Sequence, residues 1–344
     1  MEIQLVDPRT DRAWHRLIAR HPSTVFHSPE WMGVLADTYA FDVRALVALD
    51  EAGEPRSGVP FCPIQDFRGA RLVALPFCDY CDPLVEDRGE WEALLGQMLS
   101  AGQPLFMRCL RNPLPVQDAR LTTIRQARWH GVDLQDDVDA VWNRCEPSAR
   151  RAIRKAQHAG VQVRPAEDEK TLRAFYDLHL GVRKFKYRLL AQPYTMFESV
   201  WQRFLVPQKG RLLVATKADE IIAGAVFLKW KDRLFYKFAA SDPAHLGDRP
   251  NDLVMWEGIR YAKAEGLTYL DLGLSDWEQE GLIRYKRKFA TEEGAIRFLR
   301  LSHTAAGPGG DHAFLHELTQ LFTDPAVPDR VTEMAGGVLY RYLA

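Results

Sequence analysis

The sequence predicts an α/β (α+β) protein made of two similar domains in tandem, each a mixed, mostly antiparallel sheet flanked by helices. Two observations lead to this prediction. Strand-like and helix-like stretches alternate along the 344 residues, and the same order of elements occurs once in each half of the chain. At about 100–200 residues per domain, this length suits two domains that each bury their own core.

The second half carries the clearer copy of this order, within residues 211–273. The segments RLLVAT, IIAGAVFLKW and RLFYKFAAS predict three strands, and the short turns KADE and KD between them make an antiparallel meander. NDLVMWEGIRYAKAEG has apolar residues at helical spacing, with Asn251 as a plausible N-cap and Gly266 as the residue that ends the helix. LTYLDLG is then a strand that must return beside the third by a crossover, so the sheet is mixed.

The first half repeats this order with weaker signals. VRALVAL, GVPFCPIQDF and ARLVALPF predict three strands, EWEALLGQMLSAG a helix, and PLFMRCL a closing strand. Val47 aligns with Val214 and Leu75 with Ala239 at a nearly constant offset. A repeat of this length predicts two similar domains, although any two α/β domains could share such an order.

We therefore expect an N-terminal domain at 1–147 and a C-terminal domain at 148–303. A Gly/Pro-rich connection, AAGPGGDH, follows Ser302, and an amphipathic stretch comes after it. We expect residues 304–344 to form a helical segment that packs back on the first domain.

Composition excludes several classes of protein. The chain has 45 Lys+Arg and 46 Asp+Glu, a net charge of −1, and 47% hydrophobic residues, which argues against disorder and against a nucleic-acid binder that is basic all over. The start, MEIQLVDPRTDRAW, has charges and no apolar core, and no apolar stretch is long enough to span a membrane. Five cysteines are few and odd in number, which fits a reducing compartment, so we expect a cytoplasmic protein.

Lysine and arginine are nevertheless concentrated in three short segments. The first, SARRAIRKAQHAG, predicts a helix with Ser148 as N-cap, and its cations lie four residues apart in two rows. Such rows repel unless they face solvent or bind a phosphate-bearing polyanion, and both interpretations stay open. The four cations are Arg150, Arg151, Arg154 and Lys155.

The other two basic segments are RKFKYR and RYKRK. In the first, Arg183 and Tyr187 are four residues apart and could present a cation and a hydroxyl to one ligand, although helix C-terminal turns often carry cations for dipole reasons alone. The second follows a loop after the strand that carries Asp271. Ligands gather at the carboxyl ends of strands joined by parallel crossovers, which makes this segment the stronger site candidate.

Other sequence motifs do not indicate a functional site. Cys78 and Cys81 form a lone CxxC that Pro83 follows closely, so we interpret it as incidental. The sequence has no GxxxxGK[ST], GxGxxG, HExxH or GxSxG, and its histidines show no metal-ligand spacing. We expect no metal site.

Several segments in order resemble the FemAB-like, or BioF2-like, branch of the GNAT acyltransferase superfamily, over most of residues 25–300. They are FHSPEWMGVL, LPFCDYCDPLVED, SARRAIRKAQHAGV, RPNDLVMWEGIRYAKAEGLTYLDLG and GLIRYKRKFA. The resemblance implies tandem GNAT-like domains. It also implies transfer of an aminoacyl group from aminoacyl-tRNA to an amine of a peptidoglycan precursor.

The resemblance also suggests roles for individual residues. The lysine of the family's motif falls on Lys286, near the reacting centre, and Arg183 and Tyr187 match positions that hold phosphates of the acceptor. Phe289-Ala290 replaces the usual Phe-Gly, and no lysine follows Trp31 closely, which weakens the case for a peptidoglycan acceptor. We expect the substrate-binding residues to be Arg183, Lys186, Tyr187, Tyr236 and Asn251.

Acyl transfer to an amine requires loss of a proton and stabilisation of a tetrahedral oxyanion. We expect Lys286 to supply positive potential, with backbone N–H groups of the RLFYKFAAS strand. Asp271 either accepts the proton or caps the end of its strand. We expect Lys286 and Asp271 to be the catalytic residues.

The donor is a separate question. GNAT enzymes that use acetyl-CoA cradle its pyrophosphate on a Gly-rich turn, whereas the corresponding AHLGDRPNDL has one glycine, and Pro250 lacks an N–H. This favours aminoacyl-tRNA as co-substrate, held by Arg150, Arg151, Arg154 and Lys155, with no tightly bound cofactor. The acceptor would be an amine on a cell-wall, polysaccharide or peptide precursor.

Two alternatives stay open. One is an acyl-CoA-dependent N-acyltransferase, and the other is a non-catalytic tandem GNAT module that binds tRNA or an anionic glycan. The sequence predicts no transmembrane segment, and peripheral membrane contact stays open.

Overall fold

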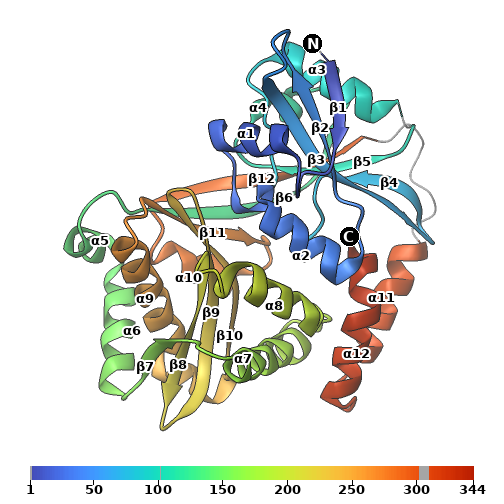
Figure 1. Cartoon of the computed structure of the whole chain (residues 1–344). Helices are drawn as coiled ribbons and strands as arrows, with labels where there is room; N and C mark the ends of the chain where they lie inside the picture. Colours follow the sequence, from blue (N-terminus) through green and yellow to red (C-terminus); the bar gives the residue numbers. More distant parts are fainter. Residues whose placement is uncertain (1, 101, 302–309) are drawn as a thin grey trace. The chain divides into compact units, whose positions relative to one another are not determined.

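The structure, a computed structural model, describes all residues except 1, 101 and 302–309 (Figure 1). It confirms a mixed α/β fold with mostly antiparallel strands. The chain forms two compact units, of which the first holds Met1–Arg128, Gly294–Ala313 and Ala344. The second holds Trp129–Glu293 and Phe314–Leu343. The expected connection after Ser302, with the boundary at 303, lies outside the described residues, and the expected domain division stays a prediction.

The first unit is built on strands in the order β1-β2-β3-β4-β5-β12. Neighbours are antiparallel except β4 and β5, where Leu72 lies opposite Leu105 in a parallel pair. Its elements are β1 (Glu2–Val6), α1 (Arg12–Arg20), η1 (Val25–His27), α2 (Pro29–Tyr39), β2 (Arg44–Leu49), β3 (Pro55–Asp66), β4 (Gly69–Val73), α3 (Arg88–Leu99), β5 (Leu105–Cys109), α4 (Pro113–Gln117) and most of β12 (Glu292–Leu301). β6 (Thr122–Asp133) runs from this unit into the second.

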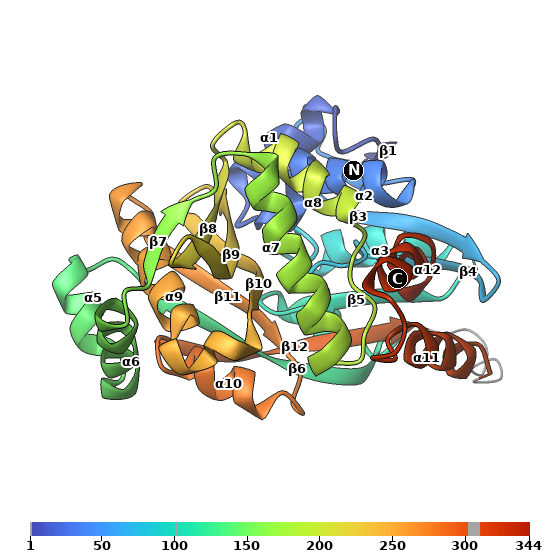
Figure 2. The same cartoon turned by 90° about the horizontal axis from the view of Figure 1, so that it is seen from below.

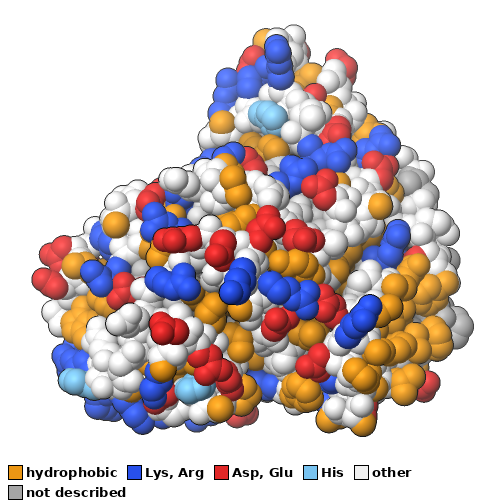
Figure 3. Space-filling model, turned by 60° about the horizontal axis from the view of Figure 1, so that its bottom comes forward, with side chains coloured by type: hydrophobic (Ala, Val, Ile, Leu, Met, Phe, Trp, Pro, Cys, Tyr) orange, Lys and Arg blue, Asp and Glu red, His pale blue; other side chains and the backbone are white. Residues whose placement is uncertain are grey.

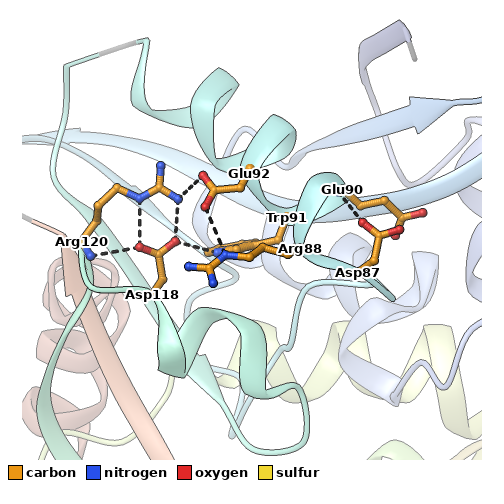
Figure 4. A network of polar contacts seen from close by, with 7 residues as sticks. All are labelled: Asp87, Arg88, Glu90, Trp91, Glu92, Asp118 and Arg120. Atoms are coloured by element: carbon orange, nitrogen blue, oxygen red, sulfur yellow. Dashed lines mark hydrogen bonds and ion pairs between the residues drawn. The ribbon is translucent and has the colours of Figure 1, made fainter.

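Polar contacts fix α3 in the first unit (Figure 4). Asp87 caps the helix by accepting a hydrogen bond from the backbone N–H of Glu90. Trp91, buried on the inner face of α3, donates its Nε1–H to Asp118 over 2.8 Å. Arg120 also binds Asp118 and holds the pKa of that carboxyl down at about 2. The network therefore joins α3 to the segment that follows α4.

The second unit has its strands in the order β11-β10-β9-β8-β7, and only β10 and β11 are parallel. Its elements are α5 (Val138–Arg144), α6 (Pro147–His158), β7 (Gln162–Pro165), α7 (Glu169–Gly181), η2 (Val182–Lys186), α8 (Tyr194–Val200), η3 (Trp201–Leu205), β8 (Gly210–Lys217), β9 (Glu220–Trp230), β10 (Arg233–Ser241), η4 (Pro243–Asp248), α9 (Pro250–Ala264), β11 (Tyr269–Ser275), α10 (Glu280–Arg287), α11 (Gly310–Phe322), α12 (Asp329–Leu339) and η5 (Tyr340–Leu343).

Helices cover both faces of this sheet, with α6 and α9 on one side and α7 and α8 on the other (Figure 2). Two glycines allow the helices to pack closely against β9. A Cβ on Gly258 of α9 would lie 2.3 Å from the ring of Phe227, and one on Gly224 would lie 2.8 Å from the ring of Phe175 in α7. The apolar core between the sheet and α9 includes Phe227, Leu234 and Ile259.

The predicted repeat is confirmed at the level of topology. The order β2-β3-β4-α3-β5 in the first unit matches β8-β9-β10-α9-β11 in the second, with an antiparallel meander and a parallel return in each. The tight turn between β8 and β9 has Ala218 and Asp219 at positive φ, as a two-residue hairpin requires.

Two predicted helix starts are wrong. Helix α9 begins at Pro250, and its N-cap is Arg249 at φ 62°, so Asn251 lies within the first turn and is not the N-cap. Helix α6 begins at Pro147 after Glu146, and the Ser148 hydroxyl donates to the Glu146 carboxylate. In both cases a proline takes the first helical position, where its fixed φ and missing N–H cost nothing, and moves the start toward the N-terminus.

The helices after residue 310 contact the second unit. The backbone carbonyl of Ala191 lies only 2.5 Å from where a Cβ on Gly336 of α12 would be, and Arg173 of α7 makes a two-fold ion pair with Glu333. Ala344 belongs to the first unit, where its carbonyl oxygen accepts hydrogen bonds from Arg68 and Arg71. No described helix is long and apolar enough to cross a membrane.

Candidate functional site

The second unit has a point where two parallel strands part. β10 pairs with β11 only over Arg233–Phe235, although β10 runs on to Ser241 and β11 to Ser275. The pairing of β10 with β9 also shifts register between Tyr236 and Phe238. Here β10 is no longer paired with β11 and its pairing with β9 is irregular, and such breaks in a sheet often lie next to functional sites. We call this region the strand split.

Lys286 lies beside the strand split. It projects from α10, is only 2% exposed, and its ammonium donates to the carbonyl oxygens of Gly273 (3.1 Å) and Leu274 (2.8 Å) on β11. These carbonyls lie just beyond the last paired residue, Asp271. The chain thus places a buried positive charge where β11 leaves β10.

Asp271 is also buried at this point. One of its carboxylate oxygens accepts hydrogen bonds from Trp129 Nε1 (3.0 Å) and from the backbone N–H of Gly273 (2.7 Å). Gly273 has φ 67°, a conformation that glycine adopts without strain. These contacts are those of a carboxylate that caps the end of the paired strand, one of the two roles expected for it.

Two tyrosines, Tyr236 and Tyr285, lie on the α9 side of the strand split, and we call them the tyrosine group. Tyr285 of α10 donates its single O–H to the backbone carbonyl of Asn251 over 2.8 Å, so it accepts in the hydrogen bond that it shares with the hydroxyl of Tyr236 of β10. Burial, with Tyr187 nearby, raises the pKa of Tyr236, and burial also raises the pKa of Tyr285. Both phenols therefore remain protonated at neutral pH.

The first turn of α9 adds polar groups to this cluster. Asn251 donates its side-chain amide to the Ser241 hydroxyl at the end of β10, over 3.0 Å. Asp252 is buried and pairs with Lys288 from the end of α10. Burial raises the pKa of Asp252, and Lys288 opposes that shift.

Three predicted substrate residues lie on or just after η2. Arg183 donates Nε and one terminal nitrogen to the carbonyl of Leu190, so its guanidinium holds the following turn. Lys186 is exposed, with its ammonium 5.1 Å from the centre of the Tyr187 ring. Tyr187 is close enough to Tyr236 to affect its pKa, which connects η2 to the tyrosine group.

The basic helix α6 packs one face on the core and presents the other to solvent. Figure 3 shows Lys and Arg side chains along the lower left edge, where α6 lies in Figure 1. Arg150 contacts Asn143 weakly, and Arg154 lies over the ring of Trp142. Among the described residues, no carboxylate lies within ion-pair distance of Arg151, Arg154 or Lys155.

The turn before α9 is acidic, in contrast to α6. Asp242 and His245 lie with Glu220 in a partly exposed trio whose ligand atoms are within 4.8 Å of one another, the one such group among the described residues. Asp248 pairs with Lys217 and His245. Carboxylates here repel a pyrophosphate, and Pro250 has no N–H to offer one.

The first unit fills its counterpart of the strand split. After β4, the N–H of Ala74 bonds to Phe106 and that of Cys81 to Arg108, while Arg108 donates back to the carbonyl of Cys78. Asp82 then accepts three backbone N–H groups after β5, those of Leu110, Arg111 and Asn112. The chain itself thus occupies that position.

Tyr285 and Asp252 were not among the predicted site residues, and Lys184 and Lys288 were noted only as members of the basic segments. Tyr285, Asp252 and Lys288 join the cluster at the strand split, and Lys184 is buried with an ion pair to Asp329 of α12. Tyr285 immediately precedes Lys286 in the motif, which was a usable signal. Asp252 and Lys184 look like ordinary surface charges in the sequence, and only their distant partners show otherwise.

Comparison with known proteins gives a consistent class. Residues 144–287 match the family model described as an acetyltransferase (GNAT) domain. FemX is 12% identical, with a TM-score of 0.65 over 94% of this chain and 100% of that one. L-PGS from Bacillus licheniformis is 12% identical, with a TM-score of 0.55 over 91% and 98%. A tandem GNAT protein from the clavulanic acid biosynthesis pathway is 13% identical, with a TM-score of 0.56 over 89% and 99%. No curated protein matches.

Within the second unit, residues 144–287 are therefore similar to a GNAT acetyltransferase domain. The tandem architecture of the chain and its structural neighbours are those expected of FemAB-like relatives, which confirms the resemblance drawn from the sequence.

Proposed function

We propose that this chain transfers an aminoacyl or acyl group from aminoacyl-tRNA to an amine on a cell-wall, polysaccharide or peptide precursor. The observation that carries the proposal is the buried Lys286 beside the strand split of a GNAT domain. A fixed positive charge in a site with little water stabilises the oxyanion of acyl transfer, because no solvent must reorganise when the charge develops.

The tyrosine group places protonated phenols close to that charge, and a substrate that displaces the bond between Tyr236 and Tyr285 would gain the Tyr236 hydroxyl as a donor. Tyr236 and Tyr285 stay protonated, since burial raises the pKa of each. A protonated phenol can donate to a carbonyl oxygen or to a leaving oxygen as an acyl bond breaks. We assign Asp271 to holding the end of β11, because Trp129 and Gly273 already bond to one of its oxygens.

Two features favour aminoacyl-tRNA over acyl-CoA. The turn before α9 carries the carboxylate of Asp242, which lies beside that of Glu220, and carboxylates at this place disfavour a pyrophosphate. Arg151, Arg154 and Lys155 are cations on α6 with no described carboxylate partner, as a polyanion site requires. Arg183, Lys186, Tyr187, Tyr236 and Asn251 remain our proposed substrate-binding set.

The test is transfer from a defined donor. The chain is incubated with labelled aminoacyl-tRNA or with acyl-CoA and a mixture of amine acceptors, and products are identified by mass spectrometry. We expect transfer from aminoacyl-tRNA, and a loss of about 100-fold or more in kcat/KM for Lys286→Met. Lys170→Met, at an exposed lysine on α7, is the control and should retain activity.

The other outcomes would contradict particular parts of the proposal. Transfer from acyl-CoA alone would replace the proposed donor. Wild-type kcat/KM in Lys286→Met would remove Lys286 from the mechanism. Binding of tRNA without transfer from either donor would favour the non-catalytic module.

A further inference from the structure

An apolar surface covers the outward side of the two C-terminal helices. Figure 3 shows it as a broad hydrophobic area at the lower right, where α11 and α12 lie in Figure 1. Leu321, Met334 and Val338 are 60%, 62% and 65% exposed. We call the outer face the set Phe314, Leu321, Val331, Met334 and Val338. Apolar side chains gathered in this way mark a surface that binds something.

Helix α12 has two opposite sides. Thr332, Ala335 and Gly336 are buried, and Gly336 lies against the backbone of Ala191. Val331, Met334 and Val338 follow one another at intervals of three and four residues, so they form one stripe on the other side. The packing that holds α12 in the second unit is thus already complete without this stripe.

The charges of α12 are sorted in the same way. Asp329 accepts a hydrogen bond from Lys184 over 2.6 Å, and Glu333 is held by both terminal nitrogens of Arg173, so its acidic residues face the body of the unit. Arg330 and Arg341 are exposed at the two ends of the stripe. Among the described residues, neither has a carboxylate within ion-pair distance.

We propose that the outer face docks on an anionic phospholipid surface, with α11 and α12 lying in the plane of the interface. The apolar side chains of α12 would enter the acyl boundary and Arg330 and Arg341 would meet the phosphates, as in peripheral amphipathic helices. Helix α11, whose exposed Glu317 lies between Phe314 and Leu321, would stay at the level of the headgroups. A second copy of the chain fits less well. An antiparallel pair of stripes would bring Arg330 against the other copy's Arg341, and a parallel pair would bring like charges together. This proposal does not depend on the proposed function.

The test is co-sedimentation of the full chain with vesicles. Vesicles of phosphatidylcholine alone are compared with vesicles that also contain phosphatidylglycerol, at low and high salt. We expect binding that requires phosphatidylglycerol and weakens with salt. Met334→Glu/Val338→Glu should abolish it, because it places two carboxylates in the acyl boundary. Arg330→Ala/Arg341→Ala should weaken it by about fivefold per arginine removed.

Ile124→Glu/Val206→Glu is the matched control, since both residues are exposed apolar side chains outside the outer face. It should bind vesicles like the wild type, and circular dichroism should show that every variant is folded. Absence of vesicle binding, or binding that Met334→Glu/Val338→Glu leaves unchanged, overturns the proposal. A concentration-dependent dimer that this variant makes monomeric, without vesicle binding, assigns the face to a second copy instead. If the wild-type chain binds vesicles but transfers no acyl group, only the proposed function is rejected.

Discussion

Burial determines the ionisation state of His179 in the second unit. His179 of α7 donates Nε2–H to the side-chain oxygen of Gln192 over 2.8 Å and is packed among aromatic rings. Burial, with Arg183 nearby, lowers its pKa to about 3. The folded chain therefore keeps this imidazole neutral well below the pH at which the unfolded chain protonates it.

This shift predicts a pH-dependent stability. Between about pH 6.5 and pH 3 the unfolded state binds a proton at His179 that the folded state does not, so stability falls as pH falls, by about 1.4 kcal/mol per unit from this group. His179→Gln, which can still donate to Gln192, should lack this part of the dependence. Urea denaturation of both proteins at pH 7, 6 and 5 measures it. A difference between them that stays constant with pH would contradict the assignment.

At the scale of elements, α12 shows how glycine position decides packing. Gly336 and Gly337 are neighbours on one helix, yet a Cβ on the first would lie 2.5 Å from the carbonyl oxygen of Ala191, and a Cβ on the second would meet nothing within 4 Å. The helix can therefore approach the turn after η2 only because residue 336 lacks a side chain.

The two glycines give a matched pair of variants. Gly336→Ala should destabilise the chain by about 1–3 kcal/mol, because the backbone at Ala191 must move or α12 must lift. Gly337→Ala should stabilise it by up to about 1 kcal/mol, since alanine favours helix and meets no obstacle. Thermal melting with hydrogen exchange of α12 distinguishes them. Equal effects of the two substitutions would show that the close approach at Gly336 is not what holds the helix.

Most elements of the repeat could be predicted from the sequence, because alternation, tight turns and helix-ending glycines are local signals. The N-caps at Asn251 and Ser148 could not, since each gave way to a neighbouring proline. A motif singled out Lys286, whose role stays a prediction. The burial of Asp252 and Lys184 could not be predicted, because it depends on Lys288 and Asp329, which are distant in sequence.

At the scale of the whole molecule, charge is distributed unevenly and the two repeated units differ in detail. The net charge is −1, yet α6 carries cations without described carboxylate partners while the turn before α9 is acidic. The two units share a topology, but the first fills its strand split with its own chain through Asp82 and its neighbours. If the proposed function holds, this asymmetry predicts a single donor site per chain.

The uneven charge predicts how binding responds to salt. Replacing Arg150, Arg151, Arg154 and Lys155 with alanine should weaken tRNA binding and reduce the slope of log K against log[salt], because fewer counterions are released. Filter binding at several salt concentrations measures the slope, with Lys170→Ala as the single-charge control. An unchanged affinity and slope would identify the exposed side of α6 as an ordinary solvated surface.

The interleaving of the two units has a consequence for synthesis. The first unit lacks β12, which pairs with β5, until residue 301 has been made, and the second lacks α12 until near the end of the chain. Lys184 is 1% exposed in the folded protein, and Asp329 is the one described carboxylate that pairs with it. Until Asp329 has been made, that ammonium lacks the carboxylate that it is buried against. The first unit, for its part, can complete its sheet only after residues 129–293 of the second have been translated.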